Sequence, residues 1–161
     1  MSYRSNRMDI GEAALKGAVA SLVGGVVMKL LWQAEQTTLV PEDRRVTSPS
    51  TTLIENLAEE RGLQISEGQA KAAGAAFYGG NMALFGAIYG IVQSRLHPPS
   101  ALHGLLLGGL VYAANYPSFG VLPKAGIIPP PQEQTLTEAL VPVVPHVAFG
   151  LTTAAVFEAL S

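Results

Sequence analysis

The sequence contains no cysteine and few charged residues. Without cysteine, disulfide bridges, thiolate metal sites and cysteine nucleophiles are excluded. Charged residues make up 14% of the 161 residues, whereas soluble domains carry about a quarter. The formal net charge of −2 offers no basic surface, so we expect no nucleic-acid partner. The shortage of charge indicates a chain that is solvated by lipid.

The motifs of the common enzyme classes are missing as well. The sequence has no Gly-x-Ser-x-Gly elbow, no glycine-rich phosphate loop and no histidine cluster with metal-ligand spacing. No pair of carboxylates lies within an apolar segment. We therefore expect a protein that is not an enzyme and that holds no cofactor.

Four apolar segments dominate what is present, at about residues 12–33, 70–95, 100–117 and 136–159. A helix that crosses the hydrocarbon core of a bilayer, about 30 Å thick, needs roughly 20 mostly apolar residues. The segments predict an all-α, polytopic membrane protein with four transmembrane helices in a single domain, residues 1–161. A soluble bundle is the alternative, but such uncharged helices would leave it little polar surface.

Capping boxes mark three of the expected helix starts. In each box the first side chain binds a free backbone amide and the residue three positions later binds back. The pairs are Asp9 with Glu12, Ser66 with Gln69, and Thr135 with Glu138. These pairs support the boundaries independently of hydropathy.

Small residues recur at four-residue spacing along the first three segments. They are Gly17, Ser21 and Gly25, then Ala72, Ala76, Gly80, Gly86 and Gly90, and finally Gly104 and Gly108. In lipid this spacing lets helix backbones approach closely. The stripes predict tight packing, and the sequence leaves open whether the partner helix belongs to this chain or to another subunit.

Two loops carry features of their own. The loop at 34–65 contains a short amphipathic helix, expected from Thr52 to Arg61, that would lie on the bilayer surface, over its own bundle or against a partner. Thr52 and Glu55 form a further capping box at its start. The proline-rich loop at 117–134 is too apolar for a free linker, so we expect it to pack on the bundle or dip into the interface.

Polar side chains inside the spanning segments are candidates for function, because an unpaired polar group in lipid is costly. A site inside the membrane is expected from Lys29, Asn81, Asn115 and His146. Residue depths along the helices let Asn81 and His146 meet near mid-membrane. His103 lies toward the opposite face, which disfavours a haem held between His103 and His146. His146 either joins an ion or proton path or simply bonds Asn81 or a neighbouring backbone group.

The end of the first apolar segment, at 12–33, and the residues after it resemble a known family. Gly24, Gly25, Val27, Lys29, Trp32, Glu35, Pro41, Arg44 and Pro49, with the later His146, Phe149 and Gly150, carry the likeness. The chain resembles the YagU-like family of small bacterial inner-membrane proteins, whose molecular activity is unknown and of which at least one member is linked to acid resistance. The resemblance implies a multi-pass protein of the bacterial inner membrane. It also implies an interfacial cluster, to which we assign Trp32, Glu35, Arg44 and Arg45.

Three functions remain open from the sequence. The first is a structural or accessory subunit that associates with other membrane subunits or with itself. The second is a small proton or ion channel or transporter linked to acid response, which requires a hydrated route to Asn81 and His146. The third is a haem- or quinone-binding subunit with aromatic residues such as Tyr89 and Tyr112.

Overall fold

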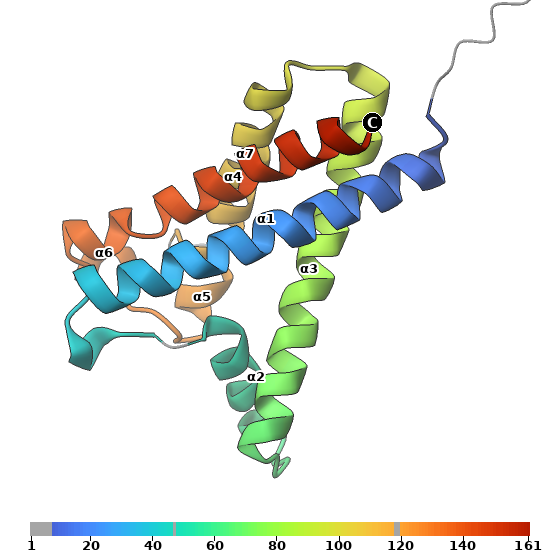
Figure 1. Ribbon diagram of the computed structural model, residues 1–161. Helices are drawn as coiled ribbons and strands as arrows, with labels where there is room; N and C mark the ends of the chain where they lie inside the picture. Colours follow the sequence, from blue (N-terminus) through green and yellow to red (C-terminus); the bar gives the residue numbers. More distant parts are fainter. Residues whose placement is uncertain (1–7, 47, 118–119) are drawn as a thin grey trace, which may run out of the picture.

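The computed structural model describes residues 8–46, 48–117 and 120–161, and all regular structure among them is helical, as predicted. Four long helices form the body, α1 (Ile10–Leu39), α3 (Glu67–Leu96), α4 (Ser100–Asn115) and α7 (Val143–Leu160) (Figure 1). The connections hold the short helices α2 (Pro49–Glu60), α5 (Val121–Lys124) and α6 (Leu136–Leu140), and the 3-10 turns η1 (Glu42–Arg44) and η2 (Pro131–Glu133).

Three helical segments are long and apolar enough to cross a membrane, namely α1, α3 and the run from Leu136 to Leu160 that joins α6 to α7. The expected span at 100–117 falls short of this length, because α4 has 16 residues and ends at Asn115. A full crossing needs roughly 20 residues. The structure therefore establishes three candidate spans where the sequence predicts four.

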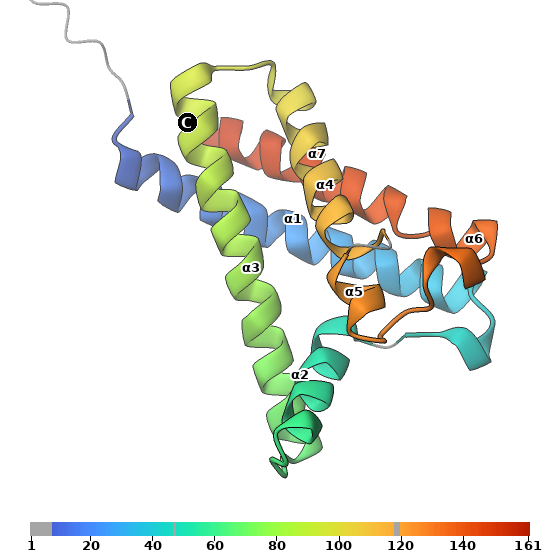
Figure 2. The ribbon, with the colours of Figure 1, turned by 180° about the vertical axis from the view of Figure 1, so that it is seen from behind.

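The four long helices pack as two crossed layers. Helices α1 and α7 lie side by side and antiparallel, α3 crosses α1 at a steep slant, and α4 crosses α7 (Figures 1 and 2). Helices α3 and α4 meet at the turn between them and then diverge (Figure 2). The first half of α3 projects away from the α1 and α7 layer, and α2 packs against it.

Small residues make the contacts between the layers. A Cβ atom on Gly17 of α1 would meet the carbonyl oxygen of Gly86 and would lie 2.9 Å from Cα of Gly90. Beside this contact, Ser21 Oγ donates a 2.7 Å hydrogen bond to the carbonyl oxygen of Met82. Tyr78 likewise donates to the carbonyl oxygen of Gly25. The stripe predicted on the first segment therefore packs against α3 of the same chain.

Helices α4 and α7 meet in the same way. A Cβ atom on Gly104 or Gly108 would collide with a carbonyl oxygen of α7, from Gly150 and His146 respectively. Close backbone approach gains dispersion contacts that lipid tails cannot replace. The question that the sequence leaves open is answered for these glycines, because their partners lie within the chain.

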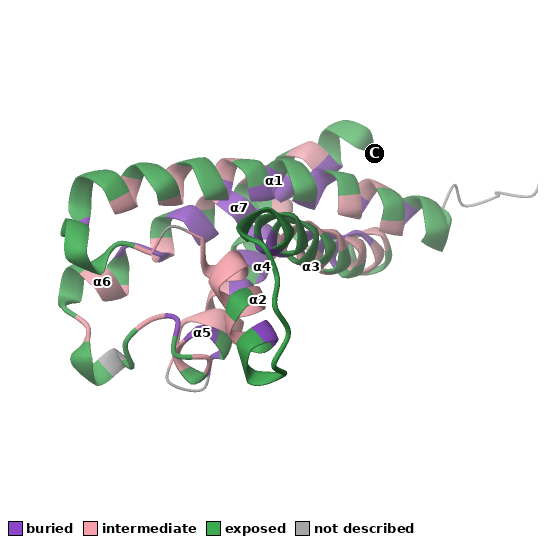
Figure 3. Ribbon diagram, turned by 90° about the horizontal axis from the view of Figure 1, so that it is seen from below, coloured by how far each residue is buried: buried purple, intermediate pink, exposed green. Residues whose placement is uncertain are grey.

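Large apolar side chains of α1 point outward while small residues point inward. Leu15, Val26 and Leu30 are 67%, 59% and 61% exposed, whereas Ala13 and Ala20 are fully buried. In Figure 3 the outer faces of α1 and α7 are exposed and their inner faces are buried. This arrangement reverses that of a helix on a water-soluble protein, where large apolar side chains turn inward.

Local sequence explains most helix starts. The capping boxes of Ser66 with Gln69 and of Thr135 with Glu138 are both present. Asp9 accepts a hydrogen bond from the amide of Gly11 as expected, but Glu12 pairs with Lys16 at 2.7 Å instead of closing a box.

Three further boundaries differ from the prediction. Helix α2 starts at Pro49 with Ser48 as its cap, not at Thr52, because proline suits the first position of a helix and Ser48 Oγ accepts from the amide of Thr51. The expected helix at 136–159 is divided between α6 and α7 at Val141 and Pro142, since proline has no amide to continue the hydrogen-bond ladder. Helix α1 also runs to Leu39, six residues beyond the expected end.

A single methyl group at the α1–α3 contact tests this packing. We expect Gly17→Ala to destabilise the protein by about 1–3 kcal/mol, because the added Cβ overlaps the backbone of α3. The matched control is Gly109→Ala on α4, where a Cβ would meet nothing within 4 Å. Thermal unfolding in detergent measures both variants, and an equal melting temperature for the two would contradict the contact.

Candidate functional site

A cavity of about 730 Å³ lies where α3 and α4 diverge. Its lining comes from residues of α1, α2, α3, α4, α5 and α7. All four polar residues expected inside the membrane, Lys29, Asn81, Asn115 and His146, belong to this lining. The steep crossing of the helices creates the cavity, because α3 and α4 are both held to the other layer and separate from each other below it.

The two asparagine amides are partly used by their own helices. Asn81 Nδ2 donates to the carbonyl oxygen of Phe77 at 2.8 Å, and Asn115 Nδ2 donates to that of Val111 at 2.7 Å. A backbone carbonyl can only accept, so each amide nitrogen must face its helix. Within the described part of the chain, neither Oδ1 atom has a hydrogen-bond partner, and each remains an acceptor at the cavity wall.

The imidazole of His146 is fixed in one tautomer by the break between α6 and α7. Its Nδ1 lies 2.6 Å from the carbonyl oxygen of Pro142, one turn earlier, so Nδ1 must carry the hydrogen. The neutral ring then has a lone pair on Nε2. His146 is 5% exposed, and the rings of Tyr112 and Tyr116 meet it edge-on with centroids 5.6 and 5.3 Å away.

Asn81 and His146 share the cavity without bonding each other in the described structure. The two residues are expected to meet, and they do line the same cavity. They do not bond each other, because each side chain donates to a backbone carbonyl oxygen one turn earlier. The remaining wall is aromatic or apolar. Its rings are Trp32, Phe77, Tyr78, Phe85 and Tyr116.

Charged residues gather at the end of the cavity away from α7. Glu55 of α2 and Glu67 and Lys71 of α3 line this rim. Lys71 and Glu67 form an ion pair of 2.5 Å, and α1 adds Lys29 to the wall. The rim therefore mixes both signs of charge and has no strong net potential.

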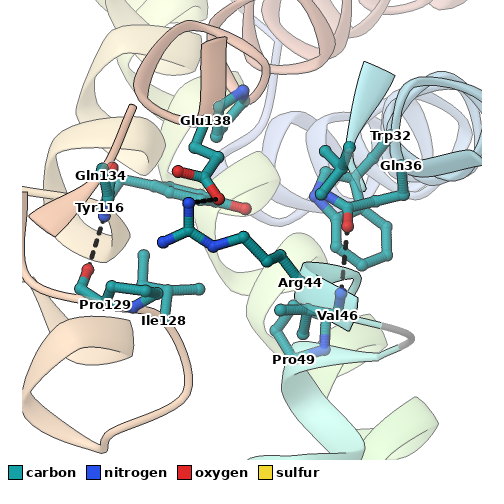
Figure 4. Close-up of a pocket in the computed structure, with 12 residues that line it drawn as sticks. Trp32, Gln36, Arg44, Val46, Pro49, Tyr116, Ile128, Pro129, Gln134 and Glu138 are labelled. Carbon is teal, nitrogen blue, oxygen red and sulfur yellow. Dashed lines mark hydrogen bonds and ion pairs between the residues drawn. The ribbon is translucent and has the colours of Figure 1, made fainter. Parts of the chain in front are cut away.

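The predicted interfacial cluster divides into separate contacts (Figure 4). Arg44 pairs with Glu138 of α6 at 3.1 Å, and Trp32 lines a small adjoining pocket of about 50 Å³ with Arg44 and Glu138. Arg45 donates hydrogen bonds to the carbonyl oxygens of Thr37, in the last turn of α1, and of Val40, its C-cap. Glu35 has one carboxylate oxygen that is buried without a hydrogen-bond partner in the described structure. Arg44 and Arg45 thus anchor the loop after α1, and the four residues do not form one mutual cluster.

The segment after α4 packs on the body of the protein. Packing on the bundle is one of the two arrangements expected for the proline-rich loop. Leu122 and Ile127 are buried, and Asn56 of α2 donates to the carbonyl oxygen of Ala125. Ser118 and Phe119 of this loop lie outside the described residues.

His103 belongs to a separate cluster. Its ring stacks on Tyr89 with centroids 4.3 Å apart, and Nδ1 lies 2.5 Å from Oε1 of Gln93. His146 contacts Tyr112 and Tyr116 instead. The two imidazoles therefore do not face each other across one haem-sized space.

The aromatic wall of the cavity was not predicted from the sequence. Its rings come from α1, α3 and the end of α4, and no spacing within one segment relates them. The available signal is weak: aromatic residues are scarce in the chain, at 7%, and Phe77 and Tyr78 lie about one helix turn before the polar Asn81.

Comparisons of the chain with protein-family models, with curated proteins and with solved structures give no match. The cavity and its surroundings are therefore the features that bear on function.

The ion pair between Arg44 and Glu138 can be tested by a double-mutant cycle. We expect a coupling of about 0.5–1 kcal/mol between Arg44→Gln and Glu138→Gln, because the pair is partly exposed. Glutamine at 138 can still close the capping box with Thr135, so its change removes mainly the charge. Unfolding in detergent measures each variant, and fully additive losses would show that the two side chains do not interact.

Proposed function

We propose that the protein is a multi-pass membrane protein in which α1, α3, α4 and the α6–α7 run all lie within the bilayer. The outward-facing leucines and valines support this proposal, because exposed apolar surface of this extent is unfavourable in water. Among them are Leu106 and Leu110 of α4, which are 62% and 59% exposed. From the resemblance to inner-membrane proteins we propose the cell membrane of a bacterium as its location.

Helix length accounts for the slanted packing in such a membrane. Helices α1 and α3 have 30 residues each and are about 45 Å long, longer than the hydrocarbon core of about 30 Å. Tilting is the usual response to this mismatch. Helix α4, with 16 residues, is about 24 Å long and would reach most of the way across.

The function that the geometry supports best is the binding of a small molecule in the cavity between α3 and α4. One observation carries this proposal. In a chain with few polar residues in its apolar helices, Asn81, Asn115 and His146 come from three helices and line the same open space. Ligand sites of this kind have volumes of 300–1,000 Å³ and a few polar groups in a mostly apolar wall.

Conduction of ions is less well supported. Beyond the cavity, α4 lies with its glycines against α7, where a Cβ on Gly108 would collide with the carbonyl oxygen of His146. Helix α1 is equally close to α3 at Gly17 and Gly86. This tight packing favours a cavity that ends inside the protein over a pore that crosses it.

A structural or accessory subunit is the second candidate, and a specific surface favours it. Ala72, Ala76 and Gly80 are exposed on the first half of α3, and a Cβ on Gly80 would meet nothing within 4 Å. These members of the predicted small-residue stripe have no partner helix in the described structure. They offer a surface on which a helix of another subunit, or of a second copy, could pack closely.

The absence of natural cysteine makes the cavity directly testable. We expect Asn81→Cys to react with a charged, membrane-impermeant thiol reagent added from the side of α2, because position 81 lines the open cavity. Leu84→Cys on the same helix is the matched control. Leu84 is 58% exposed and lies outside the cavity lining, so lipid should protect it. Labelling in sealed vesicles, read by mass, distinguishes the two.

Equal protection of both cysteines would show that water does not enter the cavity and would overturn the binding proposal. Reaction of both would instead contradict the membrane placement of α3. The outcome for position 81 thus tests the cavity, and the outcome for position 84 tests the bilayer.

The second candidate has its own measurement. Intact mass in mild detergent should show a defined oligomer or a stoichiometric partner if α3 packs against another subunit. Ala76→Leu should then dissociate that assembly, because the larger side chain prevents close approach, while leaving the reactivity of Asn81→Cys unchanged. A monomer for the unaltered protein would exclude the accessory role.

A further inference from the structure

The free donors and acceptors of the cavity wall decide which kind of group it can hold. His146 donates Nδ1–H to the carbonyl oxygen of Pro142, and its Nε2 remains an acceptor. Asn81 and Asn115 each donate an N–H to their own helix, and each has a free Oδ1. Each asparagine also keeps one free N–H, so three acceptor atoms face two N–H donors among these three side chains, and a ligand that donates a hydrogen bond fits them better than one that only accepts.

The charges around the cavity favour a ligand without net charge. Lys29 in the wall disfavours a cation, and Glu55 at the rim disfavours an anion. Glu67 and Lys71 largely neutralise each other through their ion pair. The group of the ligand that donates to Asn81, Asn115 or His146 is thus a neutral O–H or N–H group.

The wall also selects the body of the ligand. Trp32, Phe77, Tyr78 and Phe85 contribute ring faces or edges from α1 and α3, and aromatic pairs stabilise each other beyond the area that they bury. The hydroxyl of Tyr78 is already bonded to the carbonyl oxygen of Gly25 at 2.7 Å. The cavity volume of about 730 Å³ exceeds what one ring needs and leaves room for an apolar substituent.

We propose that the cavity binds a neutral amphiphile with a hydroxylated aromatic head, a phenol or hydroquinone ring, whose hydroxyl donates to an acceptor among Asn81, Asn115 and His146. This inference depends on the binding function proposed above and names its ligand class. The ring lies among the aromatic side chains, and the apolar substituent points toward the lipid or the rim.

Trp32 provides the measurement, because it is the only tryptophan and it lines the cavity. Two probes are compared in lipid nanodiscs, 4-propylphenol and its methyl ether 4-propylanisole, which lacks the hydroxyl hydrogen. We expect saturable changes in Trp32 fluorescence with the phenol bound roughly three- to tenfold more tightly, the value of one net hydrogen bond. The ether partitions more strongly into lipid, so a non-specific effect would give the opposite order.

Variants assign the effect to the cavity. At least one of Asn81→Leu and Asn115→Leu should reduce the preference for the phenol, because each replaces an acceptor by an apolar side chain of similar size. Ala114→Phe should abolish the saturable fluorescence change with both probes, since Ala114 lines the cavity and the larger side chain would occupy its space. Melting temperatures confirm that each variant remains folded.

The outcomes separate the ligand class from the function. Equal binding of phenol and ether, or a preference that survives both asparagine changes, would overturn the hydroxyl assignment and leave the binding function in place. Saturation by neither probe, with Trp32 also shielded from acrylamide added to the aqueous phase, would overturn the binding function itself.

Discussion

The close contact between α1 and α3 determines the rest of the architecture. Gly17 of α1 lies against Gly86 and Gly90 of α3, and no side chain larger than hydrogen fits between the two backbones. This contact holds only the second half of α3, so the first half projects beyond the α1 and α7 layer, where α2 packs against one side of it. Helix α4 is held to α7 by a similar contact at Gly104 and Gly150. Two crossings fixed at different places force α3 and α4 apart, and the cavity follows from that divergence.

The same contacts explain why large side chains can be left outside. In water a helix pair is stabilised mainly by removing leucines and valines from solvent. In lipid that gain disappears, and dispersion between closely packed backbones replaces it. Helix α1 follows the second rule, with Ala13 and Ala20 inside and Leu15 and Leu30 outside. A cavity in such a protein carries little hydrophobic penalty, because its apolar wall can be solvated by lipid or by an apolar ligand.

Much of the fold could be predicted from the sequence because its causes are local. The caps at Ser66 and Thr135 depend on residues three positions apart, and the glycine spacing depends on one helix turn. The start of α2 was missed because two serine or threonine caps compete there, and the proline after Ser48 decides between them. The site was only half predictable. Polar residues are easily recognised within apolar segments of the sequence. The rings of the aromatic wall come from α1, α3 and the end of α4, and only the crossing of these helices brings the rings together.

His146 shows how a backbone break controls the chemistry of a side chain. Pro142 is the N-cap of α7. Its carbonyl oxygen accepts from the imidazole at 2.6 Å, while the backbone amide of His146 lies 3.4 Å from the same oxygen. The side chain thus supplies the stronger donor at the start of α7. Because Nδ1 is committed to that role, Nε2 can only accept while the ring is neutral. The proline therefore does more than interrupt the helix, since it sets which hydrogen bonds the buried imidazole can offer to whatever enters the cavity.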